Sequence, residues 1–313
     1  MASKILTKPW PYLAILLTHI IWGANFVVAK LTLEQFPVMS LAFSRFVLAF
    51  ILLIPFIILE RKNFKIDLAD LPKIILVGLT LITLNIALFY EGLLKTTVSD
   101  ASVLVLIIPI LSVLAGWWFL KEKVYVINLV GIFSGLLGAI LIIGLPLFLL
   151  KAINNQALLG NILVVLASIS WVAGAIISKG LLKKYTPFVV TTISFIVGMV
   201  TFALPALNDY LQDPTWISQI TVLGILGLLY ITILSSIFAY FLFEWGLKKT
   251  TVAQADLFTY IEPLIATTLG VIILAERVSF SFIIGSILIG LGAYWGTLGK
   301  AQHHHPHLKS HRT

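Results

Sequence analysis

The sequence of 313 residues contains no cysteine. Without thiols the chain forms no disulfide, holds no iron–sulfur cluster and carries no thiol nucleophile. Charged residues are also scarce, at 11%, against about 25% in a typical soluble domain. Hydrophobic residues make up 60% of the chain, and its mean hydropathy is +1.07. These values exclude an ordinary water-soluble globule and indicate an integral membrane protein.

Long polar segments are missing as well. The longest break between hydrophobic runs, residues 60–71, is too short for a soluble domain. Each run is about 20 residues long, the length of helix that crosses a ~30 Å hydrocarbon layer. We predict helices because backbone groups in lipid must pair within their own segment, and because the alternation typical of barrel strands is absent. The ten predicted spans lie near residues 11–30, 37–59, 72–93, 99–120, 124–149, 157–182, 187–208, 220–245, 252–274 and 279–299.

The net charge of +8 is unevenly placed along the chain. When both termini are set in the cytoplasm and the chain crosses ten times, most lysines and arginines fall on the cytoplasmic side. The basic residues left on the outside are Lys30, Lys95, Lys151 and Arg277. The basic balance therefore indicates orientation in the cell membrane, with both termini cytoplasmic, and we expect no nucleic-acid partner.

The two halves of the sequence resemble each other. GLLKTTV at 92–98 matches GLKKTTV at 246–252, and WGANFVVAK at 22–30 matches WVAGAIISK at 171–179. We therefore predict a five-helix repeat at 1–150 and a second at 151–300, followed by a disordered cytoplasmic tail at 301–313.

Five helices per repeat is an odd number, so the second copy must enter the membrane from the opposite side. Charge supports this inversion, because Arg61, Lys62, Lys65 and Lys73 follow the second predicted helix, whereas the equivalent stretch 208–218 has no basic residue. The predicted fold is an all-α integral membrane protein, with ten transmembrane helices as two inverted five-helix repeats around a central cavity. Inverted repeats are common in secondary transporters, although duplication alone also builds a stable bundle.

Particular residues carry a resemblance to a known family. They are Trp22, Gly23, Asn25 and Lys30 in the first helix, Arg45 within SRFVLAF, and YIEPLIATTLGVIILAE at 260–276. With the double five-helix unit, they resemble the EamA group of the drug/metabolite transporter superfamily. The resemblance implies a ten-helix carrier, usually an exporter of amino acids, metabolites or drugs driven by an ion or proton gradient.

Glu262 lies near the centre of a predicted span, directly before Pro263. A charged side chain at that depth costs about 2.5–3.5 kcal/mol on insertion scales and usually faces a cavity or a partner. The matched residue of the first repeat is Ile108, whereas the proline recurs as Pro109. The carboxylate is therefore not required by the repeated fold, and we predict a function for it. Both prolines are candidate hinges, because proline removes a helical hydrogen bond.

Further candidates share the predicted polar faces of the first and ninth helices or lie close to them. On a helical wheel, Asp256, Thr259 and Tyr260 accompany Glu262, and His19, Trp22 and Asn25 share a face of the first helix. Arg45 is a candidate partner for a substrate carboxylate, and Tyr90 and Trp171 are candidate aromatic walls.

Structural explanations compete with these assignments. Glu262 pairs with Arg45 or Lys30 in one alternative, His19 only donates to a carbonyl in another, and Asp256 faces water at the interface in a third.

We expect a secondary transmembrane transporter, more specifically an exporter, of small polar or amphipathic metabolites such as amino acids. It would work by alternating access, with proton coupling through Glu262 as a hypothesis, since burial brings a carboxyl group toward neutral titration. The alternative is a membrane-embedded enzyme or lipid-handling protein that uses Glu262, Asp256 and His19. Such an enzyme needs several groups converging within about 3–4 Å, and scattered single groups favour the carrier.

The expected partners are a small-molecule substrate and the lipid bilayer, with the chain a monomer or weak homodimer. No phosphate loop, HExxH motif or nucleophile elbow occurs in the sequence. The histidines of HHHPHLKSHRT lack ordered ligand spacing. We therefore expect no enzyme activity, no cofactor and no metal ion.

Overall fold

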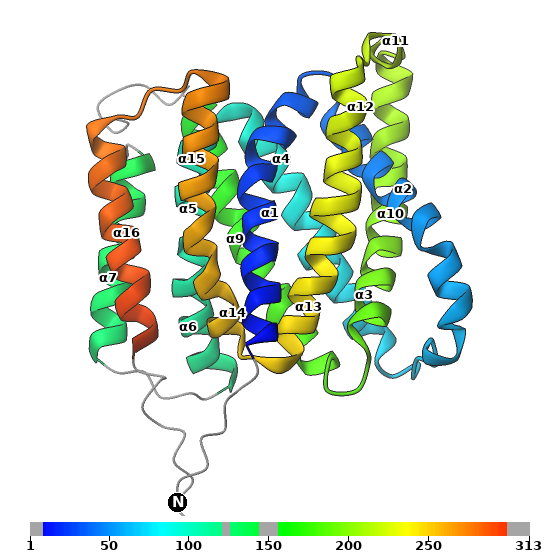
Figure 1. Cartoon of the computed structure of the whole chain (residues 1–313), viewed down its shortest axis with the longest axis horizontal. Coiled ribbons are helices and arrows are strands. Elements are labelled where there is room, and N and C mark those ends of the chain that lie inside the picture. The colour runs from blue at the N-terminus through cyan, green and yellow to red at the C-terminus, as the bar shows by residue number, and fades with distance from the viewer. Residues whose placement is uncertain (1–8, 121–125, 144–155, 299–313) are drawn as a thin grey trace, which may run out of the picture.

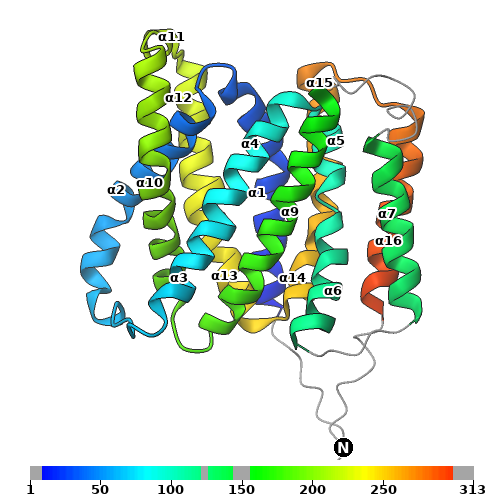
Figure 2. The same cartoon turned by 180° about the vertical axis from the view of Figure 1, so that it is seen from behind.

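The computed structural model describes residues 9–120, 126–143 and 156–298, and within these ranges every regular element is a helix. Eight helical spans are long and apolar enough to cross a membrane, and Phe280–Gly292 forms a shorter apolar helix. The helices stand side by side and roughly parallel (Figures 1 and 2). The predicted all-helical membrane fold is confirmed, while the count of ten spans stays a prediction. The predicted tail lies outside the described residues.

The elements follow one another with short connections. The first half contains α1 (Trp10–Leu33), α2 (Val38–Leu59), η1 (Arg61–Asn63), α3 (Leu71–Val77), η2 (Gly78–Leu84), α4 (Asn85–Lys95), α5 (Val98–Leu104), α6 (Ile107–Leu120) and α7 (Val126–Ile143). The second half contains α9 (Gln156–Leu181), α10 (Pro187–Gln212), α11 (Trp216–Gln219), α12 (Val222–Leu229), η3 (Tyr230–Phe238), α13 (Ala239–Lys249), α14 (Val252–Asp256), η4 (Leu257–Tyr260), α15 (Ile261–Leu274) and α16 (Phe280–Leu298).

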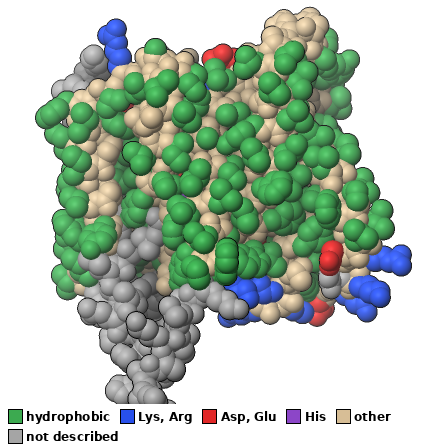
Figure 3. Space-filling view, viewed as in Figure 1, with side chains coloured by type: hydrophobic (Ala, Val, Ile, Leu, Met, Phe, Trp, Pro, Cys, Tyr) green, Lys and Arg blue, Asp and Glu red, His purple; other side chains and the backbone are tan. Residues whose placement is uncertain are grey.

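The outer surface is largely apolar. Leu204, Leu264 and Ile272 each expose 70% or more of their surface, and hydrophobic side chains cover the broad face in Figure 3. Lysine and arginine side chains gather mainly along the lower edge of that view. An exposed apolar face of this extent would aggregate in water, so it marks the surface that faces lipid.

Interruptions occur at matching places in the two halves. The third span contains the π-helical segment η2, and its counterpart contains the π-helical segment η3. A break separates α5 from α6 at Val105 and Leu106, and the 3₁₀ segment η4 separates α14 from α15. Such departures from α geometry often accompany functional sites. In each half they lie near mid-helix, where they interrupt helices that pack around the centre of the molecule.

Helices of one half pack mainly against helices of the other. α2 contacts α10 and α7 contacts α16, while α1 contacts α13 and α15, and α9 contacts α4 and α6. α1 rises from the lower edge of the molecule, whereas α9 descends from the upper edge (Figures 1 and 2). The hydrophobic interior is therefore formed jointly by the two halves.

Two lysines close the ends of neighbouring helices in the same manner. The Lys30 ammonium donates to the carbonyls of Leu93 and Thr96 at the end of α4. The Lys179 ammonium donates to the carbonyls of Leu247 and Thr250 at the end of α13. Cations at a helix C-terminus satisfy its free carbonyls and its dipole. These lysines occupy matched positions in the two halves. The same contact at a helix end therefore occurs once in each half.

Glycines allow close contact between α7 and α16. A Cβ atom on Gly138 would lie 2.5 Å from the carbonyl oxygen of Gly285, and one on Gly292 would lie 2.6 Å from that of Gly131. Small residues of this kind let helix backbones approach in a membrane, where packing rather than hydrophobicity drives association. This glycine seam, formed by Gly131, Gly135, Gly138, Gly285 and Gly292, lies inside one chain.

An ionic cluster joins the loop before α3 to the loop before α10. The Lys184 ammonium donates to Asp67 at 3.0 Å and to Asp70 at 2.6 Å, and the Tyr185 hydroxyl donates to Asp70 at 2.7 Å. The hydrogen bond from Lys184 is the largest of the effects that keep the pKa of each aspartate below its usual 3.8. Both loops lie at the lower edge of Figure 1, and the four residues fall outside the candidate membrane spans.

We expect this cluster to stabilise the folded loops at neutral pH and to fail in acid. The pKa values of Asp67 and Asp70 are lower in the folded state than the usual 3.8. Their contribution to the free energy of unfolding is therefore complete above pH 3.8 and is lost as the pH falls through the folded-state pKa values. Hydrogen exchange at the Asp67 amide, which donates to Tyr185, should show protection at pH 7 that an Asp67→Asn, Asp70→Asn double variant lacks. Equal protection in the variant would contradict this.

Candidate functional site

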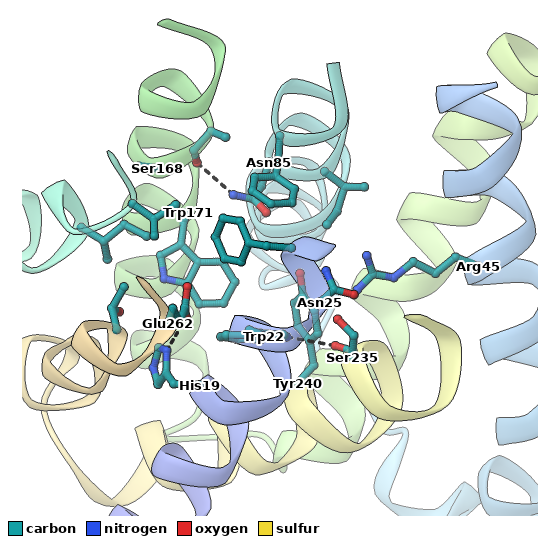
Figure 4. Close-up of a pocket in the computed structure, with 17 residues that line it drawn as sticks. His19, Trp22, Asn25, Arg45, Asn85, Ser168, Trp171, Ser235, Tyr240 and Glu262 are labelled. Carbon is teal, nitrogen blue, oxygen red and sulfur yellow. Dashed lines mark hydrogen bonds and ion pairs between the residues drawn. The ribbon is translucent and has the colours of Figure 1, made fainter. Parts of the chain in front are cut away.

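A cavity lies between the two halves, near the middle of the helices (Figure 4). Water-sized molecules have about 90 Å³ available to their centres inside it, where one water needs roughly 10–15 Å³. The cavity therefore has room for several waters or a small solute. Seven of the predicted site residues line it: His19, Trp22, Asn25, Arg45, Trp171, Thr259 and Glu262.

Glu262 and His19 form a buried pair at one side of this cavity. The Glu262 Oε1 atom lies 2.5 Å from the His19 Nδ1 atom, and the two residues are only 6% and 2% exposed. The other ring nitrogen of His19, Nε2, has no partner among the described residues. The imidazole can therefore hold a proton shared with Glu262 while its second nitrogen is available to a water or a solute.

Gly23 makes this pair possible. A Cβ atom at Gly23 would lie 3.0 Å from the Ile265 Cβ atom and 3.2 Å from the Glu262 carbonyl oxygen. Because both neighbours are backbone or branch atoms that cannot rotate away, a side chain at this position would push α1 and α15 apart by at least a few tenths of an ångström. His19, one helical turn before Gly23, is thereby brought against Glu262.

We expect a Gly23→Val substitution to separate His19 from Glu262. In the wild-type background, a double-mutant cycle of His19→Ala and Glu262→Ala, which leave no group to bond, should give a coupling free energy of about 1.5–3 kcal/mol, typical of a charge-assisted hydrogen bond. In the Gly23→Val background the coupling should fall close to zero. Gly180→Val is the matched control, since no atom lies within 4 Å of a Cβ there. Unchanged coupling in Gly23→Val would contradict this explanation.

The π-helical segments supply carbonyl groups to side chains from other helices. The Trp22 indole donates to the Ser235 carbonyl in η3 at 3.0 Å, and the Ser170 hydroxyl donates to the Thr80 carbonyl in η2 at 2.8 Å. Wide turns leave such carbonyls open to bonding outside the helix. They thus fix the orientation of Trp22 at the cavity.

Aromatic rings form one wall of the cavity. Trp22 meets Trp171 edge to face with ring centres 5.0 Å apart, and it meets Tyr240 at 5.4 Å. His19 also packs edge to face against Trp22, at 5.5 Å. Edge-to-face pairs are a favoured arrangement of aromatic rings, so this wall is a rigid, largely apolar surface with indole and imidazole edges.

Arg45 reaches the cavity from α2, on the side away from Glu262 (Figure 4). Its side chain is 1% exposed. The guanidinium donates to the Ser236 hydroxyl and, at 2.9 Å, to the Tyr90 hydroxyl. It also lies over the ring of Phe46, 5.3 Å from the centroid.

Three predicted site residues do not line the cavity. Tyr90 lies behind the lining, where it bonds to Arg45 and contacts the ring of Phe89. Asp256 is fully buried and accepts from the Ser112 hydroxyl on α6. Tyr260 lies in η4, and its hydroxyl has no partner among the described residues.

The candidate hinges follow interruptions of their helices. Pro109 is the third residue of α6, and Pro263 is the third residue of α15. Proline is tolerated in the first turn of a helix, where amide groups have no partner to donate to. The prolines therefore begin new helical segments after a break, rather than kink a continuous helix.

The structure corrects the three competing explanations for the charged residues. Glu262 bonds to His19 and not to Arg45 or Lys30, and His19 bonds to a carboxylate and not to a carbonyl. Asp256 does not face water, because it is 0% exposed.

Several cavity residues escaped the sequence analysis. Asn85, Ser168 and Ser235 line the cavity, and Ser236 bonds to Arg45. Asn85 carried a usable signal, because an amide inside an apolar span usually faces the interior. Serines are common on both lipid-facing and packed faces of membrane helices, so those three carried none. Across the described ranges, no group of three or more histidine and acidic side chains is placed to hold a metal ion.

An acid and an imidazole buried at a cavity between the two halves, in a chain whose described elements are apolar helices, define a membrane protein with a polar interior site. The sequence matches the EamA-like transporter family over residues 9–144 and again over 158–297. The chain belongs to this family and is a membrane transporter.

Relatives cover nearly the whole chain. A protein of Archaeoglobus fulgidus named as an uncharacterized transporter is 27% identical over 93% of this chain and 98% of its own length. A protein of Clostridium kluyveri with the same name is 28% identical over 90% and 91%. A solved crystal structure has the same fold, with a TM-score of 0.65 at 18% identity, covering 91% of this chain and 95% of its own.

Proposed function

We propose that the protein is a secondary carrier, and specifically an exporter, of small polar or amphipathic metabolites such as amino acids. The main observation in support of this proposal is a central cavity that both halves line and that contains the buried Glu262–His19 pair. Intramembrane ionisable groups of this kind typically belong to substrate or proton pathways. We further propose that it resides in the cytoplasmic membrane with both termini inside, as the distribution of lysine and arginine favours.

The proposal includes two inverted repeats, 1–150 and 151–300, that exchange conformations. Its support is the matched pair of π-helical segments, the matched breaks before Pro109 and Pro263, and the matched lysine caps at Lys30 and Lys179. Because contacts run mainly between halves, the bodies that rock around the shared site would each combine helices of both repeats.

Proton coupling is part of the same proposal. His19 is the partner of Glu262 in this conformation, so a proton taken up by Glu262 weakens the bond that holds α1 to α15. A solute that contacts His19 Nε2 would compete for the same proton. The enzyme alternative has less support, because Asp256 is engaged by Ser112 and does not line the cavity.

Single-cysteine labelling tests the carrier directly, since the chain has no cysteine of its own. Ser168→Cys and Ser235→Cys place a thiol in the cavity, and Ser218→Cys places one on an exposed connection as a control. A membrane-impermeant maleimide should reach both cavity thiols from either side of vesicles and the control thiol from one side only. Cavity thiols labelled from a single side under every solute and pH condition would overturn alternating access.

Transport itself is tested with purified protein in liposomes. Pooled metabolites at two pH values should yield at least one solute that moves only in protein-containing vesicles. The direction in which this solute moves under an imposed pH gradient then distinguishes export from uptake.

A further inference from the structure

We propose that Arg45 is the anchor for a carboxylate of the transported solute, and that the solute is an amphipathic organic acid whose ammonium group, where present, is dispensable. This inference rests on the proposed carrier function and assigns the substrate class of its cavity. The geometry that supports it is a buried cation facing the cavity with neutral partners.

The bonding partners of Arg45 are neutral. A guanidinium has five N–H donors, and that of Arg45 donates to the hydroxyl groups of Ser236 and Tyr90. Within the described part of the chain, no carboxylate lies within 4.0 Å of it. A cation that is 1% exposed and lacks an acid is costly unless something negative accompanies it.

The repeated fold does not require this arginine. Pro37 and Pro187 align the second helices of the two units, and on that alignment Arg45 corresponds to Phe195. Phe195 is also fully buried, so the architecture accepts an apolar side chain at the matched place. Arg45 and Glu262 are thus both departures from the repeat, and both face the one cavity.

The surroundings of Arg45 suit a planar oxyanion. Asn25 lies beside the guanidinium in Figure 4, and its side-chain oxygen has no partner within the described chain. The Ser235 hydroxyl, also on the cavity wall, is likewise without a partner there. The Ser235 hydroxyl can donate its hydrogen to a carboxylate held by Arg45, and the Asn25 amide can do so when it is turned so that its NH2 group takes the place of the oxygen.

The rest of the cavity does not offer a comparable site for an ammonium. Among the lining residues Glu262 is the one acid, and it is already bonded to His19 at 2.5 Å. Trp22 and Trp171 form the wall between the two charged groups. A cationic solute in this space would also meet the field of Arg45. The binding site therefore fits a carboxylate attached to a flat apolar body.

The test uses wild-type protein in detergent and four probes of one shape, with affinity measured by titration calorimetry and thermal shift. L-phenylalanine and 3-phenylpropanoate carry the carboxylate, L-phenylalaninamide lacks it, and 3-phenylpropylamine replaces it with an ammonium. Both carboxylates should bind with similar affinity, and the other two at least about tenfold more weakly, as expected for loss of a charged hydrogen bond. Equal binding of the amide, preference for the amine, or no binding of either carboxylate would overturn the inference.

Variants add a second readout. Arg45→Gln should erase the preference for carboxylate over amide, whereas Tyr90→Phe, which keeps the guanidinium, should preserve it. Failure of Arg45→Gln to fold leaves the wild-type comparison decisive. The proposal of a carrier and the proposal of its substrate class can be disproved separately, because cysteine labelling does not require a bound solute. Cavity thiols reached from both sides without carboxylate binding overturn the substrate class alone.

Discussion

We expect vesicles that carry Glu262→Gln to equilibrate the transported solute without concentrating it, whereas wild-type vesicles that exchange one proton per solute should sustain a gradient of up to about tenfold for each pH unit across the membrane. The reason is that glutamine keeps the shape of Glu262 and can still bond to His19 but cannot exchange a proton. Without exchange the pH gradient has no means of driving the solute. The measurement is the steady-state ratio of labelled solute inside and outside liposomes with an imposed pH difference.

A matched control is available at Glu91. This residue pairs with Lys95 at 2.5 Å on the same helix, and its side chain is 37% exposed. Glu91→Gln should therefore concentrate solute as the wild type does. Persistent concentration by Glu262→Gln would remove Glu262 from the coupling mechanism while leaving facilitated carriage intact.

Replacing either of two glycines on α16 with alanine should have very different effects on the stability of the protein. A Cβ atom at Gly292 would lie 2.5 Å from the Gly135 amide nitrogen, whereas one at Gly290 meets nothing within 4 Å. Gly292→Ala should therefore lose about 2–3 kcal/mol of unfolding free energy, at the upper end of overpacking effects because backbone cannot turn aside. Gly290→Ala should be neutral or slightly stabilising, since alanine favours helix.

Unfolding in mixed micelles, followed by circular dichroism at increasing fractions of denaturing detergent, gives both values on one scale. If Gly292→Ala proves as stable as Gly290→Ala, then α7 and α16 do not meet through the glycine seam.

The fold class could be predicted from the sequence because each of the features that determine it can be recognised independently of the others. Apolar runs of spanning length, few charges and a lack of intervening domains each indicate membrane helices without reference to tertiary contacts. That Glu262 would be buried away from lipid was also accessible, since a lone intramembrane carboxylate is costly. Its presence in the cavity follows the prediction, although its role remains a proposal.

The partner of Glu262 was not accessible, because it depends on how closely two helices approach. That distance is set by the contact of Gly23 with Ile265 and the Glu262 backbone, a pairing between segments far apart in the chain. A sequence pattern identifies which face of α1 is polar but not which neighbour it meets.

Tyr260 shows a different limit. The predicted polar face assumed an α-helix from Asp256 to Glu262, with 100° between residues. Leu257–Tyr260 is instead a 3₁₀ segment, in which each residue turns about 120°. The accumulated difference accounts for the absence of Tyr260 from the lining that contains Thr259 and Glu262.

The wide turns in η2 and η3 have a consequence for descent within the family. A π turn accommodates one residue more than an α turn over about the same rotation, so loss of a single residue from η2 would restore regular geometry and leave Asn85 and Tyr90 facing the way they do now. The Thr80 carbonyl, which a regular helix would keep for itself, would then be lost to Ser170. A one-residue change in length at this point can therefore alter the backbone groups that this helix offers to its neighbours while its side chains keep their places.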